Sequence, residues 1–435
     1  MDHKPPGRHM IRGDRLMAGN FHQLKSANSG IQTSVIEVRD FKKLARLVPE
    51  WENLAAAALE PNVFYEHWML LPALETFAAK QDIRVILVLL HDARKPWAPP
   101  TLGGLFPLEF NHRFGKLNIL SLWRHVHCFL CTPLIRRDVA RECMGALFNW
   151  VRSAGVNSPL IQFKWISGDG PFHNILSELS SELGLVSGTT ETFTRGLWRD
   201  TSVRDGGDLT APCNQAGNQA GNQAGSQHRT LRRREKRLRE RGRVEHVALA
   251  PGENVGRWID DFLRLEAGGW KGRSGSALAC SESGRRYFRQ IATAAHDVGR
   301  LLMLGINFDG RPIARRCAFV AGEGSFAFKT AYDEKFAYFS PGTMLEIDNL
   351  RQFQALSGVQ WMDSCAAADN GLVNRLSNDR RTIQSLSTGS GALGELVAAG
   401  LPALHWTSRR LRNGLLRMNA ADLTPKQRIP RLGDD

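Results

Sequence analysis

Three polar residues stand close together at the end of an apolar β-type run, and their types could support chemistry. The run Ser325–Tyr332 contains Lys329 among aromatic and small residues, and Tyr332 and Asp333 end it. A buried lysine can bind an anionic group, a tyrosine can donate a proton, and a carboxylate can act as a base or orient a nucleophile. The alternatives are a lysine on a solvated strand face, a core aromatic residue and a turn residue.

A second candidate site follows in Ser340-Pro341-Gly342-Thr343, which precedes a run of apolar residues at helical spacing. Serine before proline is a typical helix start, because serine caps the helix and proline fits its first position. The N–H groups of a first helical turn can bind phosphate. We therefore expect Ser340, Gly342 and Thr343 to hold a phosphate group through their backbone, for which the pyrophosphate of coenzyme A is a candidate; the alternative is an ordinary capped helix.

The elements that position these residues are three strands, a helix and a short fourth strand. The strands Leu301–Phe308, Pro312–Val320 and Ser325–Tyr332 are rich in branched and aromatic residues, and glycine-containing turns separate them. After the helix, Val359–Met362 forms a short strand that ends at Asp363. The carboxylate of Asp363 could orient an amine or a hydroxyl, or it could cap the next turn.

These residues resemble a known family. The strands, Lys329-Thr330-Ala331-Tyr332-Asp333-Glu334 and Ser340-Pro341-Gly342 resemble the acetyltransferase domain of the bacterial cellulose-biosynthesis acyltransferase-like (CelD-like) group. This group belongs to the GNAT superfamily and is related to the Fem-type aminoacyltransferases. Phe262-Leu263-Arg264-Leu265-Glu266 and Trp270-Lys271-Gly272-Arg273 are similar to its pattern as well.

The resemblance implies transfer of an acyl group from acyl-CoA, with acetyl-CoA as the type donor, to an amine or hydroxyl acceptor. It implies a donor held between two splayed strands, a strand N–H that polarises the thioester carbonyl, and no metal. It also implies envelope polysaccharide biosynthesis, including that of cellulose, as the setting. The expected catalytic residues are Lys329, Tyr332, Asp333 and Asp363, with Tyr332 protonating the thiolate, and the expected substrate residues are Trp270 and Lys271 in a glycine-rich loop.

The phosphate loop departs from the usual GNAT pattern of Gln or Arg, two residues, Gly, one residue, then Gly or Ala. Only Gly342 stands in a comparable place. A non-catalytic scaffold that keeps the acyltransferase fold is therefore an alternative to an enzyme.

The predicted fold is α/β, with two related GNAT-like units, each a mixed central sheet flanked by helices. In the first half we expect strands at 33–38, 83–90, 117–122, 128–131, 160–166 and 192–198, and helices at 41–59, 64–77, 138–154 and 172–183. In the second half a strand at 244–249 and helices at 255–265 and 284–296 precede the three strands. Thr132-Pro133 before a helix matches Ser340-Pro341, which favours duplication over coincidence.

The domain prediction follows from these patterns and from low-complexity stretches such as the threefold Asn-Gln-Ala-Gly repeat at 214–225. We expect a disordered tail over 1–31, an N-terminal GNAT-like domain over 32–200, a low-complexity linker over 201–228, a C-terminal GNAT acyltransferase domain over 229–386, and a linker, basic helix and polar tail over 387–435.

The charge of the chain favours acidic partners. Its formal net charge is +14, and Arg229–Arg243 carries nine Lys or Arg against two Glu, which is half of that total. A nucleic-acid-binding protein that uses this basic helix is thus an alternative function, although no aromatic residues interleave with the cations. A solvated helix is the simpler interpretation of the run.

The remaining signals concern cysteines, histidines and location. Seven scattered cysteines and no apolar N-terminal segment favour a reducing cytoplasm. Cys128 with Cys131, and His125 with His127 on one strand face, have no further ligands nearby, so we expect no metal. The basic run and Trp406–Met418 could give weak attraction to the anionic inner membrane; the alternative is packing of the latter on the second domain.

Overall fold

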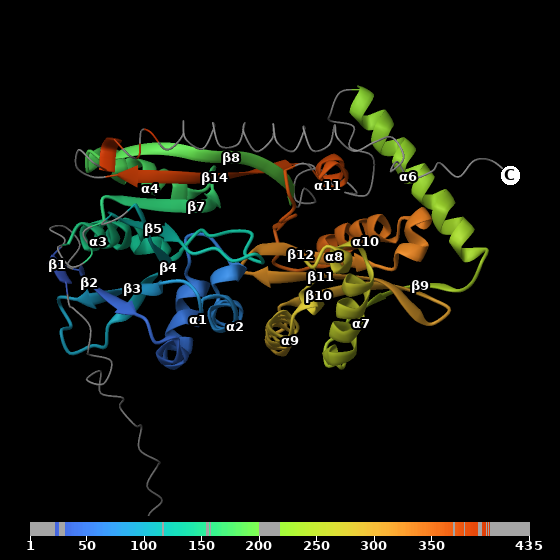
Figure 1. Ribbon diagram of the computed structural model, residues 1–435, viewed down its shortest axis with the longest axis horizontal. Helices are drawn as coiled ribbons and strands as arrows, with labels where there is room; N and C mark the ends of the chain where they lie inside the picture. The colour runs from blue at the N-terminus through green and yellow to red at the C-terminus, as the bar shows by residue number, and fades with distance from the viewer. Residues whose placement is uncertain are drawn as a thin grey trace, which may run out of the picture.

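The computed structural model describes residues 22–25, 31–114, 117–153, 156, 158–199, 218–368, 370–377, 379–389, 394–396, 398 and 400. In this part of the chain, fourteen strands form one continuous mixed sheet. The sheet runs β1-β2-β3-β4-β5-β7-β14-β8-β13-β12-β11-β10-β9, with β6 paired to β4. Figure 1 shows an N-terminal unit (22–25 and 31–199) at the left and a C-terminal unit (218–389) at the right, except that β14 of the latter lies at the left.

The N-terminal unit begins with β1 and β2 and ends with the long strand β8. Its elements are β1 His22–Lys25, β2 Ile31–Val38, the 3-10 helix η2 Phe41–Leu47, α1 Val48–Ala56, η3 Val63–Tyr65, α2 His67–Phe77, β3 Ile83–Asp92, β4 Thr101–Phe114, β5 Leu117–Leu122, β6 Leu134–Ile135, η4 Arg137–Val139, α3 Ala140–Arg152, β7 Leu160–Ser167, α4 Pro171–Glu182 and β8 Val186–Arg199.

The C-terminal unit begins with the basic helix α6 and ends with β14. Its elements are α6 Asn218–Arg239, β9 Val244–Ala248, α7 Val255–Gly268, α8 Trp270–Arg273, η5 Leu278–Cys280, α9 Glu282–Asp297, β10 Leu301–Phe308, β11 Arg311–Ala321, β12 Gly324–Tyr332, η6 Glu334–Phe339, α10 Pro341–Ala355, β13 Trp361–Asp363, α11 Gly371–Leu376 and β14 Asp379–Gly389.

The two units repeat one order of elements, as the sequence predicts. In the first, β2, two helices, the meander β3-β4-β5, α3, β7, α4 and β8 follow one another; in the second, β9, two helices, β10-β11-β12, α10, β13, α11 and β14 do so. The pairing repeats as well, because β5 pairs in parallel with β7, and β12 pairs in parallel with β13. Agreement of both order and strand direction supports an internal duplication.

The last strand of each unit completes the sheet of the other unit. β14 lies between β7 and β8, and β8 lies between β14 and β13. In Figure 1 the orange-red β14 accordingly lies among the green strands of the N-terminal unit. The predicted boundary at residue 386 falls inside β14, and the predicted linker after it begins as strand. Ser, Thr and Gly dominate this segment, but pairing on both sides fixes it as a strand.

Several predicted elements differ from those observed. Residues 41–59 form a 3-10 helix followed by α1, because Pro49 fits the first turn of a new helix but not a helix interior. The long β4, at 101–114, is absent from the predictions. Residues 128–131 belong to a loop, so His125 and His127 do not share a strand face, and β6 follows Thr132-Pro133 where a helix start is predicted.

Helix α6 begins at Asn218, inside the repeat that is predicted to be a flexible linker. Gln and Ala favour helices, and the basic run continues the same helix. The other predictions for 1–21, 201–217 and 401–435, including Trp406–Met418, lie outside the described residues.

Candidate active site

The two parallel strands of the C-terminal unit separate soon after they meet. β12 pairs with β13 at Gly324, Ser325 and Phe326. On its other side, the register with β11 skips Phe328, since Ala318 lies opposite Ala327 and Cys317 opposite Lys329. Such a bulge bends a strand and re-aims its backbone groups. Within the described residues, β13 provides no strand partner to β12 beyond Phe326, so a ligand could hydrogen-bond to that edge.

Lys329 lies directly after this bulge and forms a buried ion pair. Its Nζ donates to Oε1 of Glu266 on α7 at 2.8 Å, and the exposed fractions of the two side chains are 10% and 0%. Oε2 of Glu266 accepts the backbone N–H of Leu278. Lys329 is therefore not on a solvated strand face.

Lys271 of α8 lies next to this ion pair, and the three residues Lys329, Glu266 and Lys271 form a charged cluster. Its Nζ donates to the Thr330 carbonyl of β12 at 3.2 Å and lies 3.9 Å from Oε1 of Glu266. Burial, and then the nearby Lys329, lower the pKa of Lys271, while Glu266 raises it. The structure thus brings together Lys329 and Lys271, which the sequence predicts for different roles.

The glycine-rich loop around α8 is fixed to the first residue of η6, Glu334. Oε1 of Glu334 accepts the backbone N–H of Trp270 at 2.6 Å, and Oε2 accepts Nη2 of Arg273 at 2.7 Å. The Trp270 side chain is 57% exposed. The indole is therefore accessible to a ligand. It lies beside Lys271, whose ammonium is 5.9 Å from the ring centre.

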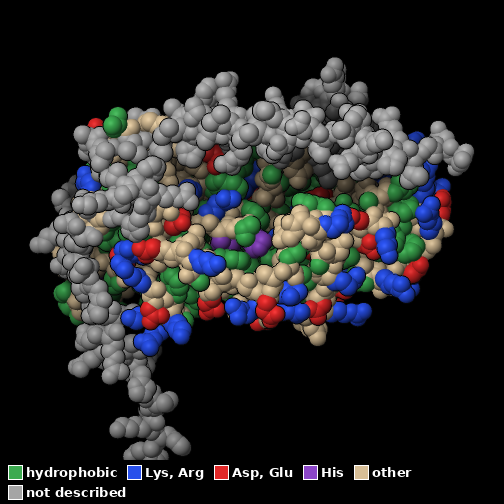
Figure 2. Space-filling view, in the orientation of Figure 1, with side chains coloured by type: hydrophobic (Ala, Val, Ile, Leu, Met, Phe, Trp, Pro, Cys, Tyr) green, Lys and Arg blue, Asp and Glu red, His purple; other side chains and the backbone are tan. Residues whose placement is uncertain are grey.

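His127 reaches the cluster from the N-terminal unit. Its ring stacks on Tyr287 of α9, with centroids 5.9 Å apart, and meets Phe328 of the bulge edge-on. Only 6% of the residue is exposed, yet no described residue hydrogen-bonds to its ring nitrogens. Burial, then Lys329, then Lys271 lower the pKa of His127 to about 3, so the ring is neutral at pH 7. Figure 2 shows histidine side chains in a hollow between the positions of α2 and α8.

The predicted phosphate cradle lies beside the C-terminal end of β12. Ser340 precedes α10 with a left-handed backbone, φ 58°, and its hydroxyl accepts from Arg234 of α6 instead of capping the helix. The predicted serine cap is therefore wrong, because this backbone turns the side chain away from the helix amides. A Cβ on Gly342 would lie 3.3 Å from Cδ1 of Tyr332, so the cradle adjoins Tyr332. Thr343 follows in the first turn, its N–H bonded to the Ser340 carbonyl.

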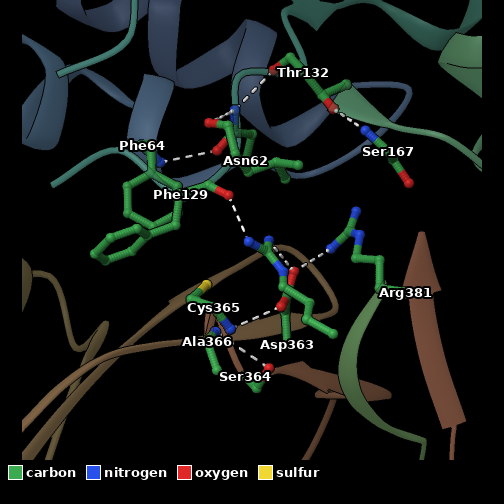
Figure 3. A network of polar contacts seen from close by, with 12 residues as sticks. Asn62, Phe64, Phe129, Thr132, Ser167, Asp363, Ser364, Cys365, Ala366 and Arg381 are labelled. Carbon is green, nitrogen blue, oxygen red and sulfur yellow. Dashed lines mark hydrogen bonds and ion pairs between the residues drawn. The ribbon is translucent and has the colours of Figure 1, made fainter. Parts of the chain in front are cut away.

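Asp333 and Asp363 lie apart from the cluster. Asp333 caps η6 by accepting the backbone N–H of Lys335 at 3.0 Å. Asp363 is fully buried between the units, where its Oδ2 accepts Nη2 of Arg195 on β8 at 2.6 Å and Nη1 of Arg381 on β14 at 3.0 Å (Figure 3).

The bonds around Asp363 extend into both units. Its Oδ1 accepts the backbone N–H of Cys365, and Nη1 of Arg195 donates to the Phe129 carbonyl at 2.7 Å. Nη2 of Arg381 lies 3.7 Å from Oε2 of Glu60. Burial alone would raise the pKa of Asp363, but Arg195 and then Arg381 outweigh it, and the pKa is lowered. Both carboxylate oxygens are occupied, so we give Asp363 a structural part.

Sequence reasoning does not find His127, Glu266 or Arg234 as site residues. Glu266 has a signal, because it follows Trp258 and Phe262 at four-residue spacing on the buried face of α7, where a carboxylate requires a partner. His127 has none, because its neighbour Tyr287 lies in the other unit.

Comparison with known families identifies the C-terminal unit. Residues 225–370 match the family described as an acetyltransferase (GNAT) domain. This part of the C-terminal unit is thus similar to GNAT acetyltransferase domains. A search among curated proteins finds no match to the chain. The GNAT assignment agrees with the predicted fold; membership of the cellulose-biosynthesis group stays a prediction.

Solved structures of similar fold cover most of the chain. FemX is 10% identical, with a TM-score of 0.51, over 81% of this chain and 98% of that one. A tandem GNAT protein from the clavulanic acid biosynthesis pathway is 12% identical, with a TM-score of 0.41, over 82% and 99%. A protein of Bacteroides thetaiotaomicron is 10% identical, with a TM-score of 0.48, over 79% and 97%. At these identities the similarity concerns the fold.

Two further observations apply to the residues that the structure describes. They contain no group of three or more His, Cys, Asp or Glu that could hold a metal ion. No helix among them is long and apolar enough to cross a membrane.

We predict that replacing His127 with glutamine makes the protein less sensitive to acid. The unfolded state binds a proton at His127 below its ordinary pKa of about 6.5, whereas the folded state does so only near pH 3. Stability is therefore lost as the pH falls through this window, by about 2 kcal/mol at pH 5 from this group. Urea unfolding at pH 7 and pH 5 should show a loss smaller by that amount in the variant.

The matched control is His173→Gln on α4, outside the cluster, which should lose as much stability between pH 7 and pH 5 as the unchanged protein. Equal losses in all three proteins would contradict the prediction.

Proposed function

We propose that the protein transfers an acyl group from acyl-CoA to an amine or a hydroxyl at the C-terminal GNAT domain. The observation that carries this proposal is the bulge at Phe328 beside the point where β12 and β13 separate. It leaves a strand edge on which a thioester carbonyl can accept a backbone N–H bond. Such preorganised donors stabilise the oxyanion of acyl transfer.

In the proposed reaction, the donor pyrophosphate lies at the start of α10, where the Gly342 N–H and the partial positive charge of the first turn would bind it. The N–H groups of Ser340 and Thr343 are bonded to the carbonyls of Ala337 and Ser340, so these two residues would shape the turn. The thioester then extends along β12. The acceptor nitrogen or oxygen attacks the carbonyl carbon, a C–N or C–O bond forms and the C–S bond breaks. The acceptor gives up one proton, and the thiolate takes one up. Tyr332, next to Gly342, is our candidate for protonating the thiolate.

The acceptor would enter from the side of Lys329, Lys271 and Trp270. An exposed indole beside a polar cluster suits a sugar ring, which can stack on it. The resemblance to the cellulose-biosynthesis group favours an acceptor in envelope polysaccharide synthesis. The carboxylate of Asp333 caps η6, so Asp333 would not contact the acceptor itself. It would act by fixing the position of the C-terminal end of β12.

Thermal unfolding with donor tests the proposal. Acetyl-CoA or a longer acyl-CoA should raise the melting temperature, since a ligand at one hundred times its Kd stabilises a protein by about 2.7 kcal/mol. Slow release of free thiol should accompany binding when a suitable amine is present. No thermal shift and no thiol release with any acyl-CoA up to saturating concentration would reject the proposal.

A further inference from the structure

The cluster beside the bulge carries more positive than negative charge. Two ammonium groups, of Lys271 and Lys329, approach one carboxylate, of Glu266. Oε2 of that carboxylate is already bonded to a backbone N–H. The nearby Arg273 and Glu334 pair with each other and leave the excess unchanged.

Both ammonium groups also retain donor capacity. An ammonium has three N–H donors, and among the described residues Lys329 has one hydrogen-bond acceptor, Glu266, and Lys271 has one, the Thr330 carbonyl. Burial makes an uncompensated positive charge costly, and this cost is what lowers the pKa of Lys271. A bound anion would supply the missing negative charge and acceptors.

A segment of the N-terminal unit, residues 123–133, contacts this cluster. Its counterpart in the C-terminal unit has a different role. The connection from β5 to α3 corresponds in the duplicated order to the connection from β12 to α10, which forms the cradle. In the N-terminal unit it contains residues 123–133 and crosses to the other unit. Phe129 contacts Phe328, and His127 stacks on Tyr287. His127 thus adds to the cluster a neutral ring with one donor and one acceptor.

We propose that the acceptor bears a carboxylate or phosphate, which Lys271 and Lys329 bind at the junction of the two units while His127 hydrogen-bonds to the same molecule. This inference rests on the proposed acyl transfer and specifies the class of its acceptor. In this proposal the N-terminal unit completes the acceptor site and binds no acyl-CoA of its own. The connection that would form its donor site, residues 123–133, instead contacts the C-terminal unit.

Titration calorimetry on the full chain, with and without acetyl-CoA, tests the inference with matched pairs of probes. Glucosamine 6-phosphate is compared with glucosamine, and galacturonate with galactose, which separates phosphate from carboxylate. The charged member of at least one pair should bind about tenfold more tightly, as expected for a charge-assisted contact in a partly buried site.

The variants locate the effect. Lys271→Met should abolish the preference for the charged probe, Lys271→Arg should keep it, and His127→Gln should weaken binding of both members of a pair. Lys335→Met, an exposed lysine of η6, is the matched control and should behave as the unchanged protein. Each variant must still bind coenzyme A, which shows that it is folded.

Equal affinity within both pairs, binding of no probe at all, or a preference that survives Lys271→Met would overturn the inference. If coenzyme A still binds in those cases, the proposed function stands and the anionic acceptor alone is rejected. If coenzyme A does not bind the unchanged protein, the proposed function is rejected as well.

Discussion

Replacing Asp363 with asparagine should lower the free energy of unfolding by about 3–5 kcal/mol, the usual cost of removing one partner from a buried ion pair. Asp363 is the carboxylate that Arg195 and Arg381 share, and none of its surface is exposed. Without it, Glu60 at 3.7 Å from Arg381 is the remaining carboxylate for two buried guanidinium groups. Urea unfolding followed by tryptophan fluorescence measures the loss.

The control is Asp260→Asn on α7, where the carboxylate pairs with Arg289 at the surface. Exposed pairs contribute about 0–1 kcal/mol, so this variant should remain close to the unchanged protein. Similar losses of unfolding free energy in the two variants would show that the buried ion pairs of Asp363 stabilise the fold no more than an exposed pair does. The wild-type contribution of Asp363 should also disappear in acid, because its lowered pKa makes it stabilising above its ordinary pKa and ineffective below its folded one.

Replacing Gly342 with glutamate should weaken binding of coenzyme A by about a hundredfold or more, which is about 2.7 kcal/mol. The carboxylate would occupy the first turn of α10, where we place the pyrophosphate, and would repel it. The fold should tolerate the change, because a negative charge in a first turn is favourable by about 0.3–1 kcal/mol. Stability and donor affinity should thus change in different directions.

Gly342→Ala separates charge from bulk. Its Cβ would lie 3.3 Å from the Tyr332 ring, which must move by only a few tenths of an ångström, so donor affinity should fall far less than with glutamate. Calorimetric titration with coenzyme A and thermal unfolding are needed for all three proteins. Unchanged affinity in Gly342→Glu would exclude the start of α10 as the donor site.

The sequence predicts the strands of the C-terminal unit well because their signals are local. A run of mostly apolar residues between glycine-containing turns predicts Leu301–Phe308, and the bounds of β10 agree. Pro341 likewise marks the start of α10. These elements bring Lys329, Tyr332 and Gly342 into one neighbourhood, so the order of the site along the chain is predictable.

The missed features depend on contacts between distant segments. β4 contains Gly103, Gly104 and Pro107, which lower strand propensity, but pairing with β3 and β5 on its two sides overrides it. The last three residues of β14, 387–389, have the composition of a linker and become strand through pairing with β7 and β8. His127 gains its neighbours only when the units meet.

The exchange of β8 and β14 has a consequence for synthesis on the ribosome. β7 borders the edge of the N-terminal sheet until β14 arrives, and β14 ends 190 residues after β8, at positions 389 and 199. At about 5–20 residues per second, a nascent chain waits roughly 10–40 s with that edge unpaired. Open strand edges template pairing with other chains. We therefore expect the nascent chain to depend on chaperones during this interval, and the N-terminal sheet to be completed only after β14 has been translated.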